Sequence, residues 1–202
     1  KKNFISINDY SFADSCIWIE QEYKDEEEYG VFEKWFELIE NHTAYADDTV
    51  AAADVSKHKE FAAMRHAVPT YINELTARAG TVKKATDTAV PRSEFRKHFA
   101  FMSDILRNSG LNHISFGHIG NSHVHTNFLP ENIREVEMAE HLNKKIIEHA
   151  VCSGGTVSAE HGIGKIKKEY FKMMLSPSRF KEMEKIKRQY DAKGLASPGN
   201  IF

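Results

Sequence analysis

The sequence predicts an α+β fold in which helices cover an antiparallel β-sheet. Segments rich in β-branched and aromatic residues alternate with longer segments whose apolar residues recur at helical spacing. A short turn signal, Gly120-Asn121, separates two of the predicted strands. Strands joined by so short a turn run antiparallel, whereas the parallel strands of a doubly wound sheet need a long crossover between them. The hairpin therefore favours the antiparallel arrangement.

The first 80 residues predict two strands and two helices. Residues 15–23 are rich in β-branched and aromatic types and predict a strand, and residues 49–53 predict a second, short one. The acidic cluster at residues 25–28 suits the positive end of a helix dipole, and apolar residues follow it at helical spacing as far as Ile39. Another helix begins near Ser56, and Pro69 predicts a kink or break in it.

The remaining residues predict a second set of alternating strands and helices. Residues 86–90 are expected to be extended, and Pro91 is expected to start a helix at its favoured first position, which Gly110 ends. Further predicted elements are strands at 112–117 and 123–129 and helices at 131–152, 167–175 and 179–190. We expect the lysine-rich residues 165–168 to form a solvated face.

Composition limits the classes of function. The chain has 202 residues, a net charge of −2 and a pI near 6.6, so it lacks the basic field typical of proteins that bind nucleic acid. Two cysteines cannot form a disulfide framework, and no apolar run approaches the roughly 18 residues of a membrane helix. These features predict a cytoplasmic protein. Since the first residues include no initiator methionine, we expect the chain to be a piece of a longer protein.

Seven of the 11 histidines lie between residues 113 and 161. If the hairpin turn is Gly120-Asn121, His118 pairs with His123, and His125 lies on the same face. Imidazoles on one face suit a divalent transition metal, with a carboxylate as a further ligand. The candidate carboxylate is Glu160, which stands in a glycine-rich stretch expected to be a loop.

The alternative interpretation is that these histidines are structural or surface residues. Other catalytic motifs are absent from the sequence. The stretch Gly162-Ile163-Gly164-Lys165 lacks the upstream glycine of a phosphate-binding loop and the third glycine of a dinucleotide site, and there is no HExxH pattern.

Three ordered motifs resemble one family. The motifs are Gly117-His118-Ile119-Gly120 with His125-Thr126-Asn127, the stretch from Gly154 to Lys165, and the ending Ser197-Pro198-Gly199-Asn200. In order and spacing they resemble the C-terminal domain of FAD-linked oxidases, the family of D-lactate dehydrogenase, the glycolate oxidase flavoprotein subunit and D-2-hydroxyglutarate dehydrogenase. The resemblance covers the chain from Asp87 to its end, and it implies a ferredoxin-like sheet covered by helices.

The resemblance implies roles for eight residues. It assigns a divalent metal such as Zn, Mn or Fe to His118, His125 and Glu160. His161 matches the catalytic base. The matched substrate contacts are Asn127, Arg65, which pairs with the substrate carboxylate, and Lys83 or Lys84.

The resemblance also implies a reaction and partners. The reaction is the oxidation of a D-2-hydroxy acid, such as D-lactate or glycolate, to the 2-keto acid, with hydride transfer to FAD. Residues 1–202 would be the substrate or cap domain, inactive without an N-terminal FAD-binding domain that this chain lacks. An iron–sulfur or other electron-transfer partner, a homodimer and a peripheral place at the inner face of the membrane are further expectations.

One departure from the family pattern lies next to the matched ligands. The common Gly-Asp-Gly-Asn turn is replaced by Gly120-Asn121-Ser122-His123, so His123 could be an extra ligand or could only line the site. Two other functions stay open from the residues alone: a metal-dependent hydrolase that needs no flavin, and a binding module without catalysis.

Overall fold

The computed structural model describes residues 15–24, 28–42, 46–52 and 54–202. They form two compact units that divide between Val68 and Pro69. Helix α2 (Val55–Ala79) contains Pro69 in its interior, so the predicted break there is wrong. A proline removes one backbone hydrogen bond, and the remaining bonds of a 25-residue helix are sufficient to continue it.

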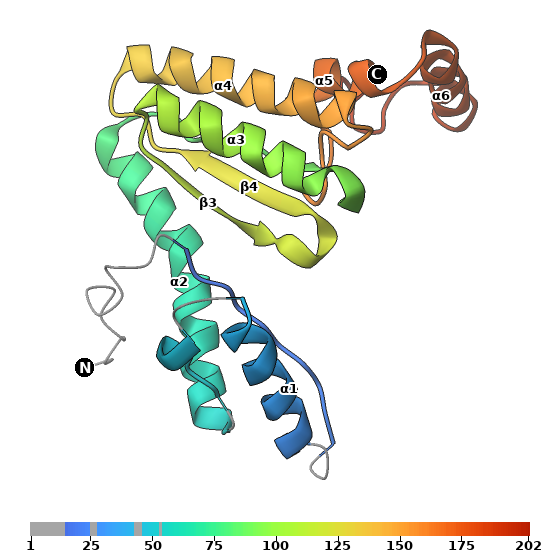
Figure 1. Ribbon diagram of the computed structural model, residues 1–202. Coiled ribbons are helices and arrows are strands. Elements are labelled where there is room, and N and C mark those ends of the chain that lie inside the picture. Colours follow the sequence, from blue (N-terminus) through green and yellow to red (C-terminus); the bar gives the residue numbers. More distant parts are fainter. Residues whose placement is uncertain (1–14, 25–27, 43–45, 53) are drawn as a thin grey trace. The chain divides into compact units, whose positions relative to one another are not determined.

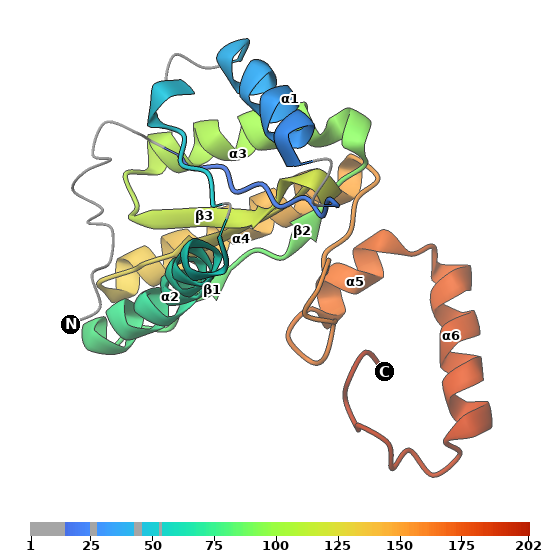
Figure 2. The same ribbon diagram turned by 90° about the horizontal axis from the view of Figure 1, so that it is seen from below.

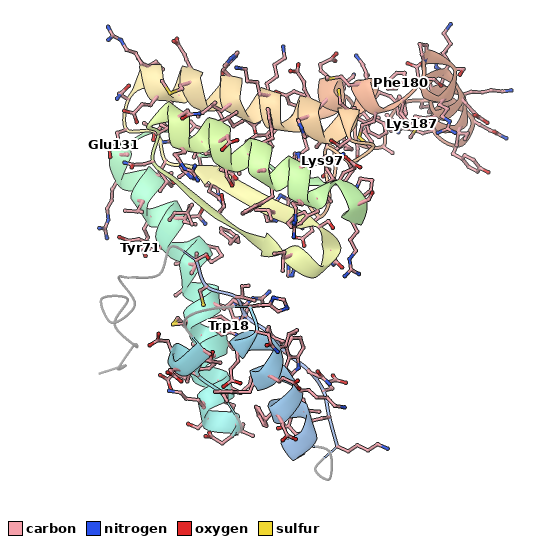
Figure 3. The ribbon with its side chains drawn as sticks, viewed as in Figure 1. Trp18, Tyr71, Lys97, Glu131, Phe180 and Lys187 are labelled. Atoms are coloured by element: carbon pink, nitrogen blue, oxygen red, sulfur yellow. The ribbon has the colours of Figure 1, made fainter. Side chains whose placement is uncertain are left out.

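The first unit is helical, and neither of its predicted strands forms. It contains α1 (Glu28–Glu40), a 3₁₀ turn (Ala46–Asp48) and the first part of α2. Residues 15–23 and 49–52 are not strands, and residues 25–27 and 53 lie outside the described part of the chain. Trp18 packs edge-on against Phe61 of α2 with ring centroids 5.5 Å apart (Figure 3). Because strand preference reflects packing on a pleated surface, these aromatic side chains instead pack on helices.

The second unit holds the predicted α+β architecture. Its strands are β1 (Lys84–Ala85), β2 (Thr88–Ala89), β3 (His113–His118) and β4 (His123–Phe128). Its other helices are α3 (Phe95–Ser109), α4 (Ile133–Cys152), α5 (Lys168–Met174) and α6 (Pro177–Tyr190). The sheet is antiparallel throughout, and α3 and α4 cover one of its faces (Figures 1 and 2). The predicted fold class is confirmed.

Most helix ends of this unit follow the local signals. Gly110 ends α3 with a left-handed φ of 67°, as predicted. The Asn132 side chain caps α4 by accepting a hydrogen bond from the backbone of Glu135. Pro91 is not the first residue of α3, because a 3₁₀ turn (Arg92–Glu94) lies between them.

Strand β4 is the centre of the sheet. It pairs with β3 along one edge and with both β1 and β2 along the other. The two short strands share one register against β4, so residues 84–89 lie along it as a single edge. Beyond that edge, Thr156 bridges to Ala89 and donates a backbone hydrogen bond to it at 2.8 Å. The segment that follows α4 is thereby added to the sheet.

The β3–β4 hairpin has the predicted register but a different turn. His118 pairs with His123, as expected. The connection is a four-residue loop with a 3₁₀ turn (Ile119–Asn121), and the positive φ falls on Ser122 at 54° rather than on Gly120 or Asn121. Two-residue and four-residue loops leave the same residues opposite one another, so the error in the turn does not change which side chains share a face.

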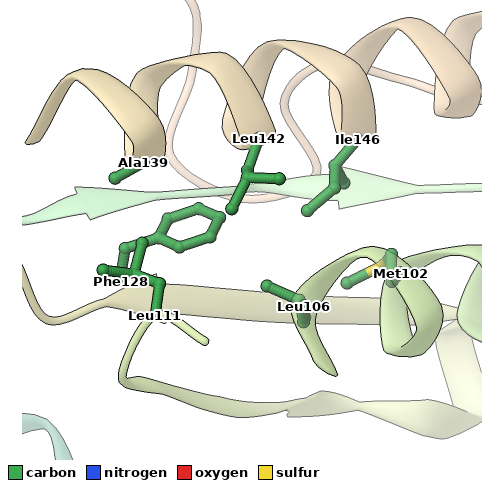
Figure 4. Packing of buried hydrophobic residues seen from close by; sticks show 7 residues of the cluster. All are labelled: Met102, Leu106, Leu111, Phe128, Ala139, Leu142 and Ile146. Atoms are coloured by element: carbon green, nitrogen blue, oxygen red, sulfur yellow. The ribbon is translucent and has the colours of Figure 1, made fainter. Parts of the chain in front are cut away.

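The two faces of β4 have different neighbours. Phe128 belongs to the hydrophobic core, and Val124 packs against that core. Side chains alternate along a strand, so His123, His125 and Asn127 lie on the opposite face. The core itself lies between the sheet and the two helices (Figure 4) and consists of Met102, Leu106, Leu111, Phe128, Ala139, Leu142 and Ile146. Burial of each large side chain in it contributes about 1.5–3 kcal/mol.

The end of the chain returns to the loop that follows α4. The backbone N–H of Ile201 donates to the carbonyl of Gly164 at 3.2 Å. The ring of Phe202 packs on Phe180 of α6, which Figure 3 labels, with centroids 5.3 Å apart. Among the described helices, none combines the length and apolar character that crossing a bilayer requires.

Candidate metal centre

Three histidines of the hairpin surround the carboxylate of Glu160. Its Oε1 lies 3.3 Å from His118 Nε2 and 3.4 Å from His123 Nδ1, and its Oε2 lies 3.4 Å from His125 Nε2. The shared register of β1 and β2 places Asp87 opposite His125 on the same face. His123 and His125 are buried, whereas Glu160 and His118 are almost half exposed. The cluster is therefore open to solvent on the side of Glu160 and His118.

A close approach of the backbone brings Glu160 to the histidines. Gly155 passes the β2 edge so closely that a Cβ atom there would lie 2.3 Å from the carbonyl oxygen of Ala89. Only glycine fits without a shift of the backbone. The N–H of Ala159 then donates to the carbonyl of Asp87 at 2.9 Å, which holds the following residue, Glu160, above the histidine face.

The side chain of Asp87 holds the loop that contains Glu160 in place. Its carboxylate accepts hydrogen bonds from Ser158 Oγ at 2.8 Å, from the backbone N–H groups of Glu160 and His161 at 3.2 and 3.0 Å, and from Lys167 Nζ. Burial by itself would raise the pKa of Asp87, but the bonds from Lys167, His161 and Ser158 hold that pKa well below its usual range. Asp87 is therefore a buried, ionised carboxylate.

His161 lies beside the cluster and reaches solvent. Its Nδ1 is 3.5 Å from Asp87 Oδ2, and its ring stacks on that of His125 with centroids 4.9 Å apart and planes 11° apart. The side chain is 61% exposed. A carboxylate at one ring nitrogen orients an imidazole and leaves the other nitrogen available to exchange a proton.

The donor atoms fit a divalent cation. His125 Nδ1 lies 3.0 Å from the carbonyl of Thr86, which can only accept a hydrogen bond, so Nδ1 carries a proton. The Nε2 of His125 lies 3.4 Å from Glu160 Oε2. Desolvation raises the pKa of Glu160, but the hydrogen bond with His125 and the charges of the histidines lower it below its usual value. Imidazole nitrogens that face an ionised carboxylate are ligands for zinc, manganese or iron.

Two of the predicted substrate contacts, Asn127 and Lys83, have different surroundings. Asn127 lies on the histidine face of β4, and its buried Nδ2 has no hydrogen-bond partner among the described residues. Lys83 donates to the side chain of Asn73 at 3.0 Å. Both stay predicted contacts.

The other two predicted contacts, Lys84 and Arg65, belong to different units. Lys84 pairs with Phe128, so its side chain is on the helix side of the sheet, where it forms a 2.6 Å ion pair with Glu140 of α4. Arg65 is an exposed residue of the other unit, on α2.

Sequence reasoning missed two residues of this site. Lys167 was expected to lie on a solvated face, yet its side chain is only 17% exposed and contacts Asp87, so that expectation is wrong for Lys167. Asp87 was placed in an extended segment without a role. The alternation of Asp87 with Ala85 and Ala89 can be read from the sequence. The strand with which this segment pairs cannot.

Comparison with known proteins identifies the family. The family model of the C-terminal domain of FAD-linked oxidases matches residues 13–201. The chain is 27% identical to the glycolate oxidase subunit GlcD of Bacillus subtilis over 168 residues, 82% of this chain and 33% of that protein. It is 35% identical to D-2-hydroxyglutarate dehydrogenase of Stutzerimonas stutzeri over 43% of this chain and 20% of that protein. It is 29% identical to D-lactate dehydrogenase of Archaeoglobus fulgidus over 59% of this chain and 27% of that protein.

The aligned part of the chain thus spans a third or less of each of these relatives. The match to the family model nevertheless runs through both units and contains every residue of the histidine cluster. The chain belongs to the family of C-terminal domains of FAD-linked oxidases.

Proposed function

We propose that this chain is the substrate-binding and metal-binding part of a flavin-dependent oxidoreductase that converts a D-2-hydroxy acid to the 2-keto acid. One observation carries the proposal: the Glu160 carboxylate stands among the hairpin histidines, and the adjacent His161 lies against the buried Asp87. The names of the three relatives support the substrate class, because glycolate, D-lactate and D-2-hydroxyglutarate are all 2-hydroxy acids.

His118, His125 and Glu160 are the proposed metal ligands. When bound, a divalent metal supplies positive charge that lowers the pKa of a hydroxyl group coordinated to it. The protein contributes a partly fixed donor set, since His125 is oriented by its bond to Thr86 and Glu160 by its place in the anchored loop. Such outer contacts hold ligands in the geometry that binding requires.

His161 is the proposed general base for the substrate hydroxyl. Its exposed ring can accept the proton, and Asp87 at Nδ1 stabilises the imidazolium that results. General-base catalysis of this kind contributes about 10²–10⁴ in rate. Arg65 is the proposed partner of the substrate carboxylate and Lys83 a further proposed substrate contact, and the buried Nδ2 of Asn127, which has no partner among the described residues, is available for a substrate oxygen.

FAD, held by a separate FAD-binding domain, is the proposed electron acceptor and would supply the site for hydride transfer from the α-carbon. An iron–sulfur or other electron-transfer partner for the reduced flavin and a homodimeric assembly are predictions from the family resemblance.

The test is flavin reduction by the full-length protein that contains this chain. Bleaching of oxidised flavin is followed after rapid mixing with D-lactate, glycolate or D-2-hydroxyglutarate, with and without a chelator. We expect His161→Ala to slow reduction at least about 100-fold, the lower limit for loss of a general base, with FAD content unchanged. The exposed His141 provides the matched control, and His141→Ala should reduce flavin like the wild type.

Three results would contradict the proposal. Unchanged reduction in His161→Ala would remove His161 from the mechanism. Metal-dependent hydrolysis of an ester or amide without flavin reduction would favour the hydrolase. A protein that binds no metal and reduces no flavin would favour a binding module.

A further inference from the structure

We propose that His123 is a further ligand of the metal ion, so that three imidazoles and one carboxylate hold it. This inference rests on the proposed function, because it concerns the same ion.

Each of the three imidazoles lies at the distance from Glu160 that separates two ligands of one ion. With metal–ligand bonds of about 2.0–2.1 Å, neighbouring ligand atoms of a tetrahedral site lie roughly 3.3–3.4 Å apart. Oxygen atoms of Glu160 lie 3.3 Å from His118 Nε2, 3.4 Å from His123 Nδ1 and 3.4 Å from His125 Nε2. The distance from His123 to Glu160 therefore matches the distances from Glu160 to His118 and His125, the two histidines already proposed as ligands.

The two carboxylates beside His123 also favour a cation at this site. One of its ring nitrogens faces Glu160, and the other, Nε2, lies 3.4 Å from Asp87 Oδ1. A neutral imidazole has a single N–H, so one of these contacts joins a ring lone pair to a carboxylate oxygen, an arrangement that a cation between the two atoms would stabilise. The side chain is 3% exposed, so water has little access to separate them.

Asp87 determines on which side of His123 the ion binds. Its carboxylate accepts hydrogen bonds from Lys167, Ser158 and the loop backbone, and its Oδ1 lies 3.4 Å from the buried Nε2 of His123. A carboxylate behind a ligating histidine is a recurrent feature of metal sites, where it selects the tautomer and raises ligand basicity. The ion therefore binds at Nδ1, on the side of Glu160.

The arrangement of His125 supports the same geometry. Its Nδ1 is directed to the Thr86 carbonyl on the side of Asp87, and its Nε2 is directed to Glu160. Both buried histidines thus direct one ring nitrogen to the side of Asp87 and the other toward Glu160. Three nitrogen donors predict a preference for zinc, iron or cobalt over magnesium or calcium, which prefer oxygen ligands.

The experiment measures metal binding and coordination, independently of turnover. Metal-free protein is titrated with Zn²⁺ in competition with a chromophoric chelator, and with Co²⁺ while its visible absorption is recorded. The variants are His123→Asn, His123→Gln, His118→Asn and, as a matched control on the exposed surface of α4, His141→Asn. Far-ultraviolet circular dichroism verifies that each variant is folded.

We expect the wild type to bind one ion per chain. Each His123 substitution should weaken Zn²⁺ binding at least about 10-fold, the lower limit for loss even of an outer contact, and should alter the Co²⁺ absorption because a nitrogen donor is lost. His141→Asn should match the wild type.

The outcomes separate this inference from the function on which it rests. If His118→Asn abolishes binding while both His123 variants keep wild-type affinity and Co²⁺ absorption, His123 is not a ligand and only this inference is overturned. If the wild type binds no ion, the proposed metal function and this inference are both overturned.

Discussion

Two groups of histidines lie on opposite sides of the sheet and have different neighbours. On the helix side, His98 of α3 and His149 of α4 meet with their Nδ1 atoms 2.9 Å apart, and the ring of Phe101 stacks on His149 with centroids 4.1 Å apart. Neither belongs to a potential metal-ligand group of the described residues. On the other side, the hairpin histidines face two carboxylates.

Carboxylates, rather than the number of imidazoles, thus distinguish the proposed metal site from the packed pair. Two neutral imidazoles satisfy each other with one proton, and aromatic stacking fills the remaining surface. Burial, together with the charge of His149, lowers the pKa of His98 from 6.5 to about 4. An ionised carboxylate adds a negative charge that a divalent cation can offset.

Removal of the buried carboxylate should give the largest loss of stability. Asp87→Asn leaves the ammonium group of Lys167, which is 17% exposed, without its partner. Breaking a buried ion pair in this way costs about 3–5 kcal/mol. Urea unfolding near neutral pH measures the loss, and Asp87→Asn combined with Lys167→Met should recover part of it because neither charge then remains. A loss similar to that of an exposed pair would show that Asp87 does not organise the loop.

The helix-side pair should make the protein less stable in acid. The pKa of His98 is about 4 in the folded chain and near 6.5 when unfolded, so between these values the unfolded state binds more protons. Stability is therefore full above pH 6.5 and falls as the pH decreases toward 4, by roughly 3 kcal/mol in total. His98→Leu should flatten this part of the curve of unfolding free energy against pH, whereas His141→Leu should leave it unchanged. An unaltered slope in His98→Leu would assign the pH dependence to other groups.

Substitution on the two sides should separate metal binding from packing. His125→Leu should weaken Zn²⁺ binding at least about 100-fold, the upper limit for loss of an outer contact and equivalent to about 2.7 kcal/mol. His98→Leu should bind Zn²⁺ like the wild type, because its imidazole faces another imidazole. Equal losses in the two variants would contradict the distinction between the two groups.

The smallest effect is expected at Lys84. Its ion pair with Glu140 has side chains that are 31% and 55% exposed, so Lys84→Met should cost less than about 1 kcal/mol. Because this side chain lies on the helix side of the sheet, we also expect the KM for a 2-hydroxy acid in the full-length protein to stay within about twofold. A large rise in KM with unchanged stability would instead indicate that Lys84 contacts the substrate.

The success of sequence reasoning depended on how local each signal is. The hairpin register followed from turn residues a few positions apart, and the end of α3 followed from Gly110 alone. The strand predicted at residues 15–23 did not form, because composition cannot show whether a partner strand exists. The sequence shows Lys167 only as one lysine of a run that is expected to be solvated. In the fold, its side chain contacts a buried carboxylate 80 positions away.

The sequence by itself determined the alternation that places His123, His125 and Asn127 on one face, since period two is a property of any strand. It also indicated Glu160 as the carboxylate that joins the histidines of that face. Only the tertiary structure decided that Asp87 stands behind His123 and that Gly155 lets the Glu160 loop pass against β2. Both depend on contacts between segments far apart in the chain, and such contacts are selected by the packing of the whole unit rather than by neighbouring residues.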